Sequence, residues 1–275
     1  MRLYRIPHRH RGDVYVPSVT TVLGKTSSEK SKRALENWAA NNPGAKEEAC
    51  IRGSTIHECC EHYLRNLPVN CPGKYQPFWN GIEKYLAKYD DILWSERPMK
   101  PEWRPITVAG DGMPRIWSER FFYSGTPDLV GIQGGLVVLA DYKTSNGPYC
   151  RTFPKDSTDR QKFTGWMKYQ KVGMQLAAYA IAFEETLGVH IDACQVIVST
   201  EEICQTFFIR GSEFAKFKNK WIERCRDFWV LMAQAESASG RPSEMAFPHG
   251  FQPRTARPKP TSTVIVQPQL ALAAA

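Results

Sequence analysis

The strongest constraint on the fold of this chain is a short apolar hairpin that carries an aspartate at the end of each strand. Residues 129–133 and 136–142 are rich in Val, Ile and Leu, and Gly134-Gly135 joins them. This pattern predicts two antiparallel strands around a tight glycine turn. Asp128 begins the first strand and Asp141 lies near the end of the second. The hairpin therefore brings both carboxylates to one end of the sheet.

Two carboxylates at one end of a sheet need a cation, because like charges a few ångströms apart resist joint ionisation and a buried charge without a partner is costly. Hard oxygen ligands suit Mg²⁺ or Mn²⁺. Lys143 lies two residues beyond Asp141 and so points to the same face of the strand. There its ammonium could orient a water molecule or stabilise a phosphoryl transition state. The three residues indicate a metal-dependent phosphodiesterase.

Each of these residues also has an ordinary structural interpretation. Asp128 follows Pro127, and Pro-Asp is favoured in turns. Asp141 could end its strand and pair with a surface lysine, and Lys143 could be a solvated charge. We prefer the metal site because Asp141 follows five apolar residues and is expected near the core.

Several motifs together carry a family resemblance. Gly125-Thr126-Pro127-Asp128, then Asp141-Tyr142-Lys143-Thr144, then Gln175 and Tyr179 stand in an order that resembles the PD-(D/E)xK nuclease superfamily. The match is closest to the RecB-type branch, which adds an upstream histidine motif, represented here by Gly53 and His57. Residues 17–23, with Trp38, are similar to the start of phage exonucleases and of mitochondrial genome maintenance exonucleases. The resemblance covers residues 13–235.

The resemblance implies an α/β fold with a restriction-endonuclease-like αβββαβ core, in which helices flank a central mixed sheet. The length of 275 residues fits one domain. We expect a single nuclease domain over residues 1–236, with an N-terminal helical arch at residues 13–66. Residues 237–275 are rich in Pro and Ala and are predicted to be a disordered tail.

Hydrophobic periodicity predicts the individual elements. The expected helices are residues 29–41, 47–64, 75–93, 166–187 and 212–235. The expected strands are residues 116–123, 129–133, 136–142, 191–199 and 204–209. Residues 98–114 are interpreted as an insertion and residues 145–165 as a loop.

The resemblance also implies roles for individual residues. The implied metal ligands are His57, Asp128, Asp141, the backbone carbonyl of Tyr142 and an acidic residue on the preceding strand. Lys143 would be catalytic, with Gln175 near the water or phosphate and Tyr179 bracing it.

The acidic ligand has two candidates, since Trp94-Ser95-Glu96-Arg97 and Trp117-Ser118-Glu119-Arg120 are near duplicates. We prefer Glu119, which leads directly into the hairpin, over Glu96. His57 could instead be an ordinary core or surface histidine.

Charge indicates the class of partner. Lys and Arg number 36 against 28 Asp and Glu, a formal net charge of +8, which favours a polyanion such as DNA. One region combines basic and aromatic side chains, a combination typical of single-strand binding. The predicted nucleic-acid contacts are Arg151, Lys155, Arg160, Lys162, Trp166 and Lys168. Alternatively, the region is a solvated loop that its aromatic residues anchor to the core.

Some RecB-type relatives carry an iron–sulfur cluster, and we expect none here. Cys194, Cys204 and Cys225 are 10 and 21 residues apart, and no Cys-x-x-Cys spacing occurs. Because cluster ligation usually depends on close pairs, reduced thiols are the better interpretation.

The predicted function is a Mg²⁺- or Mn²⁺-dependent DNA nuclease, an exonuclease acting on single-stranded DNA ends in recombination, repair or replication. A non-cutting DNA-binding subunit of a recombination or packaging complex and a flap or structure-specific endonuclease are the alternatives. A recombinase or a single-strand-binding protein is an expected partner.

No apolar run reaches about 20 residues and no signal-peptide core follows Met1, so we expect a cytoplasmic protein without a membrane partner, in a bacterium or in the host of a phage.

Overall fold

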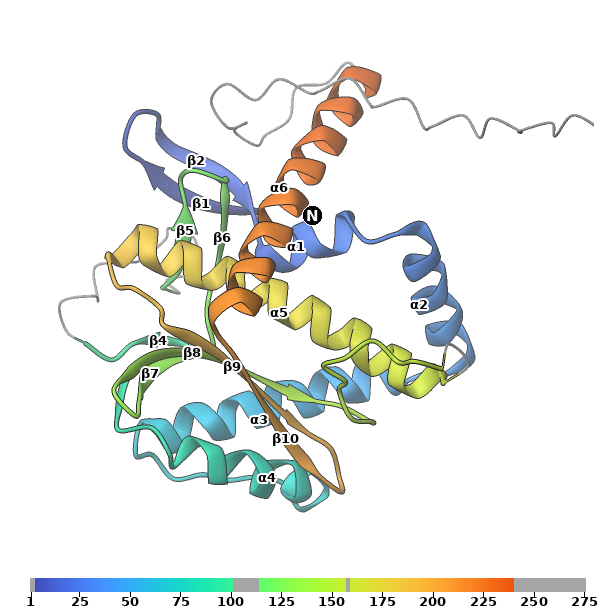
Figure 1. The fold of residues 1–275 in the computed structure, drawn as a ribbon, viewed down its shortest axis with the longest axis vertical. Helices are drawn as coiled ribbons and strands as arrows, with labels where there is room; N and C mark the ends of the chain where they lie inside the picture. The colour runs from blue at the N-terminus through green and yellow to red at the C-terminus, as the bar shows by residue number, and fades with distance from the viewer. Residues whose placement is uncertain (1–2, 101–113, 157–158, 240–275) are drawn as a thin grey trace, which may run out of the picture.

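The computed structural model describes residues 3–100, 114–156 and 159–239 and shows an α/β fold (Figure 1). Within these residues the central sheet has six strands in the order β10-β9-β8-β7-β3-β4. β8 and β9 are parallel, and the other neighbours are antiparallel. The strands are β3 (Asp91–Ser95), β4 (Arg97–Pro98), β7 (Leu129–Gln133), β8 (Leu136–Thr144), β9 (Ala193–Ser199) and β10 (Cys204–Ile209). The sheet is therefore mixed, as predicted.

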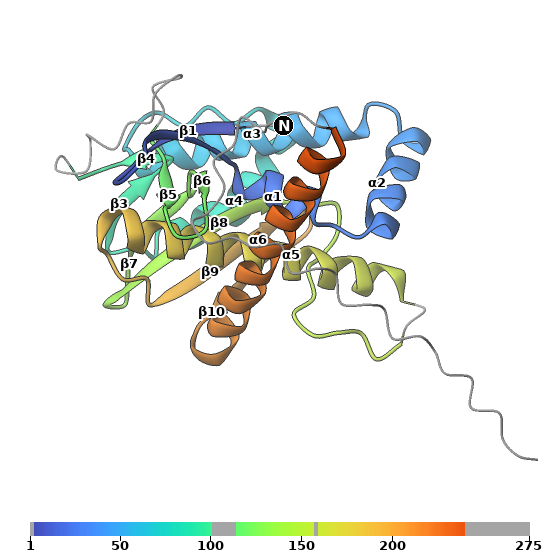
Figure 2. The ribbon, with the colours of Figure 1, turned by 90° about the horizontal axis from the view of Figure 1, so that it is seen from above.

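Helices cover both faces of this sheet (Figures 1 and 2). The cluster formed with α3 (Ala45–Leu64) and α4 (Gln76–Leu86) includes Ala140. The cluster formed with α5 (Arg160–Leu187) and α6 (Gly211–Ser239) includes Leu139. Because successive side chains of a strand point to opposite faces, these neighbours on β8 serve two separate cores. All seven residues of β9 are buried, as expected for a strand covered on both faces.

The hairpin predicted from residues 129–133 and 136–142 is confirmed. Gly134 and Gly135 both have positive φ, 56° and 77°, as a tight turn between twisted strands requires. Leu129 pairs with Ala140, so Asp128 and Asp141 flank the last pair of the β7–β8 ladder. Both carboxylates therefore lie at the same end of the sheet.

The remaining helices and hairpins lie before the central sheet or beside it. Outside it, β1 pairs with β2 and β5 pairs with β6. The bounds are β1 (Leu3–His8), β2 (Gly12–Pro17), α1 (Val19–Lys25), α2 (Glu29–Asn41), the short 3₁₀-helix η1 (Gly73–Tyr75), β5 (Ile116–Ser118) and β6 (Tyr123–Gly125). The prediction for α2 is confirmed, and the Ser28 side chain caps this helix by accepting a hydrogen bond from the backbone of Ser31.

Three predicted elements are wrong. Residues 13–17 form a strand, so the N-terminal segment 13–66 is not wholly helical. Residues 116–123 do not form a strand of the central sheet. The chain reverses at Phe122, which has φ 55° and whose N–H donates to Ser118 O at 2.9 Å, and the product is the separate β5–β6 hairpin.

The third error concerns residues 75–93, predicted to be one helix. α4 ends at Leu86, and the chain then forms β3, which pairs with β7 on the side away from β8. The helical spacing of apolar residues before β3 led to the prediction of one long helix. Ile92, Leu93 and Trp94 are consecutive apolar residues, and they divide between the two faces of the sheet.

The loop predicted at residues 145–165 is shorter than expected. α5 begins at Arg160, because the Asp159 side chain accepts a hydrogen bond from the backbone of Lys162 and caps the helix.

Of the predicted tail, residues 237–239 end α6 and residues 240–275 lie outside the described residues, as does most of the predicted insertion, residues 101–113. In the described part of the chain, no helix has the length and apolar character needed to cross a membrane.

Phe183 tests the core between α5 and the sheet. Its side chain is fully buried and packs edge-on against Trp94, with ring centroids 5.8 Å apart. Phe183→Ala is expected to lower the free energy of unfolding by about 3–5 kcal/mol, since it removes a buried ring and leaves a cavity. Phe163→Ala, on the same helix but 42% exposed, should cost less than about 1.5 kcal/mol. Urea denaturation checks both values, and similar losses for the two variants would contradict this description of the core.

Candidate functional site

The two hairpin aspartates are buried at the end of β7 and β8. Asp128 is 7% exposed and Asp141 is 1% exposed. Asp128 Oδ2 accepts a hydrogen bond from the backbone of Tyr142 at 3.0 Å, which joins the two strand ends. The side chain of Tyr142 is buried, and whether its carbonyl also binds a metal stays a prediction.

His57 lies beside Asp128. It comes from α3, and its ring stands edge-on to Tyr142 with centroids 5.5 Å apart. His57 Nε2 is 3.7 Å from Asp128 Oδ2, and a hydrogen bond of 3.0 Å joins His57 Nδ1 to Glu96 Oε1. One ligand atom from each of His57, Glu96 and Asp128 lies within 4.8 Å of the others. We call these three residues the acidic triad.

Glu96, not Glu119, completes this group. Glu119 lies in the turn between β5 and β6, where its carboxylate pairs with Arg9 Nε at 2.9 Å. Glu96 lies between β3 and β4, and its N–H donates to Asp128 O at 2.9 Å. Our preference for Glu119 is therefore wrong. It rested on closeness along the chain, whereas the pairing of β3 with β7 brings Glu96 beside Asp128.

The backbone of Glu96 is strained. Its φ is 54°, a left-handed conformation that costs free energy for any residue with a Cβ. Such outliers persist where the surrounding structure enforces them, and they cluster at functional sites. In the sequence, Glu96 was noticed only because Trp94-Ser95-Glu96-Arg97 nearly repeats the motif that contains Glu119.

The other predicted catalytic residues gather on Asp141. Its Oδ2 pairs with the Lys143 ammonium, and its Oδ1 accepts a hydrogen bond of 3.0 Å from Gln175 Nε2. Gln175 Nε2 also lies 3.4 Å from the Tyr179 hydroxyl. Tyr179 in turn packs so closely on Gly125 that a Cβ there would lie 2.6 Å from the ring. The structure thus brings the four motifs of the sequence analysis together.

The electrostatics of the site are dominated by burial and mutual charge. Burial raises the pKa of Asp128, and it raises the pKa of Asp141 to about 6 against the opposing effect of Lys143. Burial alone would lower the pKa of His57, but the Asp128 carboxylate and the bond to Glu96 outweigh it and raise that pKa to about 9. Nearby carboxylates likewise keep the pKa of Lys143 above its usual value despite burial. The aspartates are therefore in a site that requires positive charge.

The acidic triad fits a divalent metal ion. It offers an imidazole nitrogen and two carboxylate oxygens, a donor set suited to Mg²⁺, Mn²⁺ or Zn²⁺. Asp141 is held by Lys143 and Gln175 instead and lies outside the triad. The three late cysteines are on β9, β10 and α6, and the expected lack of an iron–sulfur cluster stays a prediction.

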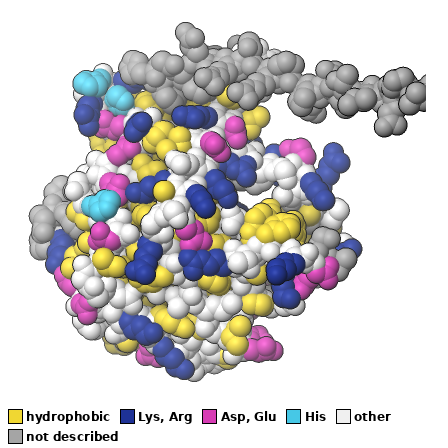
Figure 3. Space-filling view, in the orientation of Figure 1, with side chains coloured by type: hydrophobic (Ala, Val, Ile, Leu, Met, Phe, Trp, Pro, Cys, Tyr) yellow, Lys and Arg dark blue, Asp and Glu magenta, His cyan; other side chains and the backbone are white. Residues whose placement is uncertain are grey.

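The predicted nucleic-acid contacts are spread over different environments. Lys155 and Arg160 are exposed. Arg151 pairs with Glu213 of α6, and Lys162 pairs with Asp159 at 3.0 Å, so both charges already have partners. Figure 3 shows Lys and Arg side chains scattered over this face of the molecule, so their density alone does not locate an interface.

Aromatic side chains cluster near the start of α5. Trp166 packs with the exposed rings of Phe153 and Phe163, at centroid distances of 4.9 and 6.0 Å. On the helix it lies about 180° from Gln175, at 100° per residue, and so faces away from the site. Of the predicted contacts on α5, Lys168, about 20° from Gln175, and Arg160, about 60° from it, lie on the Gln175 side.

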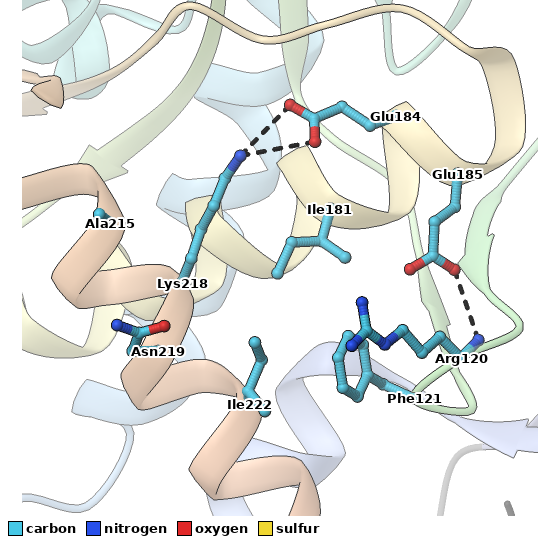
Figure 4. Close-up of a pocket in the computed structure, with 9 residues that line it drawn as sticks. All are labelled: Arg120, Phe121, Ile181, Glu184, Glu185, Ala215, Lys218, Asn219 and Ile222. Carbon is cyan, nitrogen blue, oxygen red and sulfur yellow. Dashed lines mark hydrogen bonds and ion pairs between the residues drawn. The ribbon is translucent and has the colours of Figure 1, made fainter.

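A hollow apart from this site lies between α5, α6 and the β5–β6 turn (Figure 4). Its volume is about 510 Å³. Its carboxylates are engaged, since Glu184 accepts from Lys218 Nζ at 3.3 Å and Glu185 accepts from the backbone of Arg120 at 3.4 Å. None of its lining residues belongs to the acidic triad or to the group around Asp141.

The choice between the two glutamates can be measured directly. Glu96→Gln is expected to weaken Mn²⁺ binding at least about tenfold, because it removes a charged ligand of the triad. Glu119→Gln should leave binding unchanged, since its carboxylate pairs with Arg9 instead. Isothermal titration calorimetry gives both affinities, and the reverse order would restore Glu119 as the ligand.

Metal binding should release a proton. His57 has a pKa of about 9 and is therefore protonated at neutral pH, whereas a metal ion binds only the neutral ring. The Mn²⁺ association constant is thus expected to rise about tenfold per pH unit from about pH 7 and to level off above about pH 9. Calorimetry in buffers of different ionisation enthalpy counts the protons. In His57→Gln the rise should vanish, and a rise that persists would assign the proton to another group.

The chain was compared with models of known protein families and with curated proteins. No family model matches it, and no curated protein is similar enough to count as a relative. The chemistry of the site therefore rests on the distances, burial and charges described above.

Proposed function

We propose that this protein is a divalent-metal-dependent nuclease that hydrolyses phosphodiester bonds of DNA. The observation that carries the proposal is the meeting, at one end of the central sheet, of the acidic triad and the Asp141–Lys143–Gln175 group. Neither the acidic triad nor the Asp141–Lys143–Gln175 group would by itself indicate a nuclease. Together they combine a metal-binding donor set with a lysine next to a buried carboxylate.

The topology supports the proposal. Three antiparallel strands, β3, β7 and β8, are followed by helix α5 and by β9, which pairs in parallel with β8. With a helix before β3, and with β4, β5 and β6 between β3 and β7, this order is compatible with the αβββαβ core that the PD-(D/E)xK resemblance implies. The site lies at the end of β7 and β8, where that resemblance expects it.

The residues of the site have distinct roles in this proposal. His57, Glu96 and Asp128 would hold Mg²⁺ or Mn²⁺. Such an ion, when bound, lowers the pKa of a water molecule and polarises a phosphoryl oxygen. Lys143, charged at neutral pH, would orient the attacking water or offset negative charge on the phosphoryl group. Gln175 holds Asp141 in place through its 3.0 Å hydrogen bond.

We further propose action on the ends of single-stranded DNA. Two features favour this substrate: the likeness of residues 17–23 to the start of exonucleases, and the basic side chains on the Gln175 side of α5. The test below can instead identify a DNA-binding subunit that does not cut or a structure-specific endonuclease, and either result would replace the proposal of an exonuclease.

Degradation of labelled oligonucleotides tests the proposal. Single-stranded DNA should be degraded with Mg²⁺ and left intact with EDTA. Asp141→Asn and Lys143→Gln should each lose at least about 100-fold in rate, since each removes charge placed where the transition state needs it. Asp227→Asn, an equivalent change at an exposed position of α6, is the control and should keep the wild-type rate.

Oligonucleotides blocked at the 5′ or 3′ end separate the modes of action. Protection by one block identifies an exonuclease and its polarity, whereas cutting of doubly blocked strands identifies an endonuclease. Binding without any metal-dependent cleavage would sink the enzymatic proposal.

A further inference from the structure

Basic residues extend from the candidate site along one side of α5. Lys168, Lys171 and Gln175 are three, four and seven residues apart in pairs, so they lie within about 60° of one another on the helix. At a rise of 1.5 Å per residue, Lys171 is about 6 Å and Lys168 about 10.5 Å along the axis from Gln175. Because Gln175 contacts Asp141, the two lysines lead away from the site in single file.

A third cation joins this row from α3. Arg52 Nη2 donates to Asn146 Oδ1 at 2.9 Å, and Lys168 Nζ donates to Ser145 Oγ at 2.9 Å. Ser145 and Asn146 are neighbours just after β8, so the two cationic groups meet over the same short segment. Arg52 of α3 and Lys168 of α5 thus approach the same two residues from different helices. We call Arg52, Lys168 and Lys171 the cationic row.

Within the described part of the chain, no salt bridge joins the cationic row to a carboxylate, although the charge of Arg52 acts on Glu48 one turn earlier in α3. Arg52 and Lys168 contact only neutral side chains there, besides the faces of Phe78 and Tyr149. Arg52 Nε is buried and, among the described residues, has no hydrogen-bond partner. Arg151 and Lys162, by contrast, are neutralised by carboxylates.

The charges of the row also repel one another. Burial lowers the pKa of Lys168, and the charge of Arg52 adds to that effect. Burial and the charge of Lys143 likewise lower the pKa of Lys171. Neighbouring cations without salt bridges, such as Arg52 and Lys168, are stabilised by an anion that spans them.

We propose that the cationic row binds consecutive phosphates of one extended nucleic-acid strand that passes over Ser145 and Asn146, between Arg52 of α3 and the lysines of α5. Lys168 and Lys171 are three residues apart, about 4.5 Å along the axis of α5, and Arg52 adds a charge from α3, which suits a repeating backbone charge rather than a single small anion. Because Arg52 and Lys168 border the same two residues, their charges suit one strand, whereas a duplex presents two. The inference rests on the proposed function, whose scissile linkage would lie at the Asp141 end of this row.

The salt dependence of binding tests the cationic row. Affinity of fluorescein-labelled oligo(dT) is measured by anisotropy in EDTA, from about 50 to 300 mM NaCl, so that no cleavage occurs. Each phosphate contact to a single strand contributes about −0.7 to the slope of log K against log salt. Lys168→Gln, Lys171→Gln and Arg52→Gln are each expected to make the slope shallower by about 0.7.

Matched controls keep this test interpretable. Lys216→Gln makes the same charge change at an exposed position of α6 and should keep the wild-type slope. Lys168→Arg retains the charge and should also keep it. Thermal unfolding verifies that all variants are folded.

The outcomes separate this inference from the proposed function. If the protein cleaves DNA but none of the three substitutions changes the salt slope, the role of the cationic row is refuted and the nuclease proposal is retained. A wild-type protein that binds with the expected slope changes but never cleaves would refute the nuclease and keep the row. Tighter binding of a duplex of equal length, with the same loss in the variants, would overturn the assignment to a single strand.

Discussion

The burial of two carboxylates at the end of the β7–β8 hairpin is the constraint on which the rest of the site depends. Asp128 and Asp141 lie in the core of an α/β sheet, where an ionised carboxylate is stable only beside positive charge. Lys143 meets one of them and His57 the other. The raised pKa values of both aspartates show that these partners do not fully offset the cost of burial. A divalent cation would offset the remainder.

Each surrounding element contributes one group to this arrangement. α3 supplies His57, the β3–β4 turn supplies Glu96 and α5 supplies Gln175. The left-handed backbone of Glu96 fits this picture, since the strain is the cost of aiming a side chain from a tight turn at the end of the neighbouring strand. The close contact between Gly125 and Tyr179 fixes α5 against the same strand end.

The residues of the cationic row differ from the other basic residues in their hydrogen-bond partners, and the number of basic residues does not reveal this difference. The chain carries 36 lysines and arginines, and many of them are scattered over the surface or tied to carboxylates. Arg52 and Lys168 differ because their hydrogen-bond partners are neutral and because they meet over one short segment beyond β8. No composition or local pattern contains that information, since the two residues are 116 positions apart (168 − 52).

The sequence by itself determined the β7–β8 hairpin, its glycine turn, the helical periodicity of α2, and the identity of Asp128, Asp141 and Lys143 as candidates, whereas Gln175 and His57 became candidates through the family resemblance. These features depend on neighbours a few residues apart, where alternation, capping and turn chemistry act. Only the tertiary structure decided that β3 pairs with β7, and hence that Glu96 rather than Glu119 reaches Asp128. The physical reason is that strand pairing joins residues distant in the chain, so two nearly identical local motifs receive different neighbours.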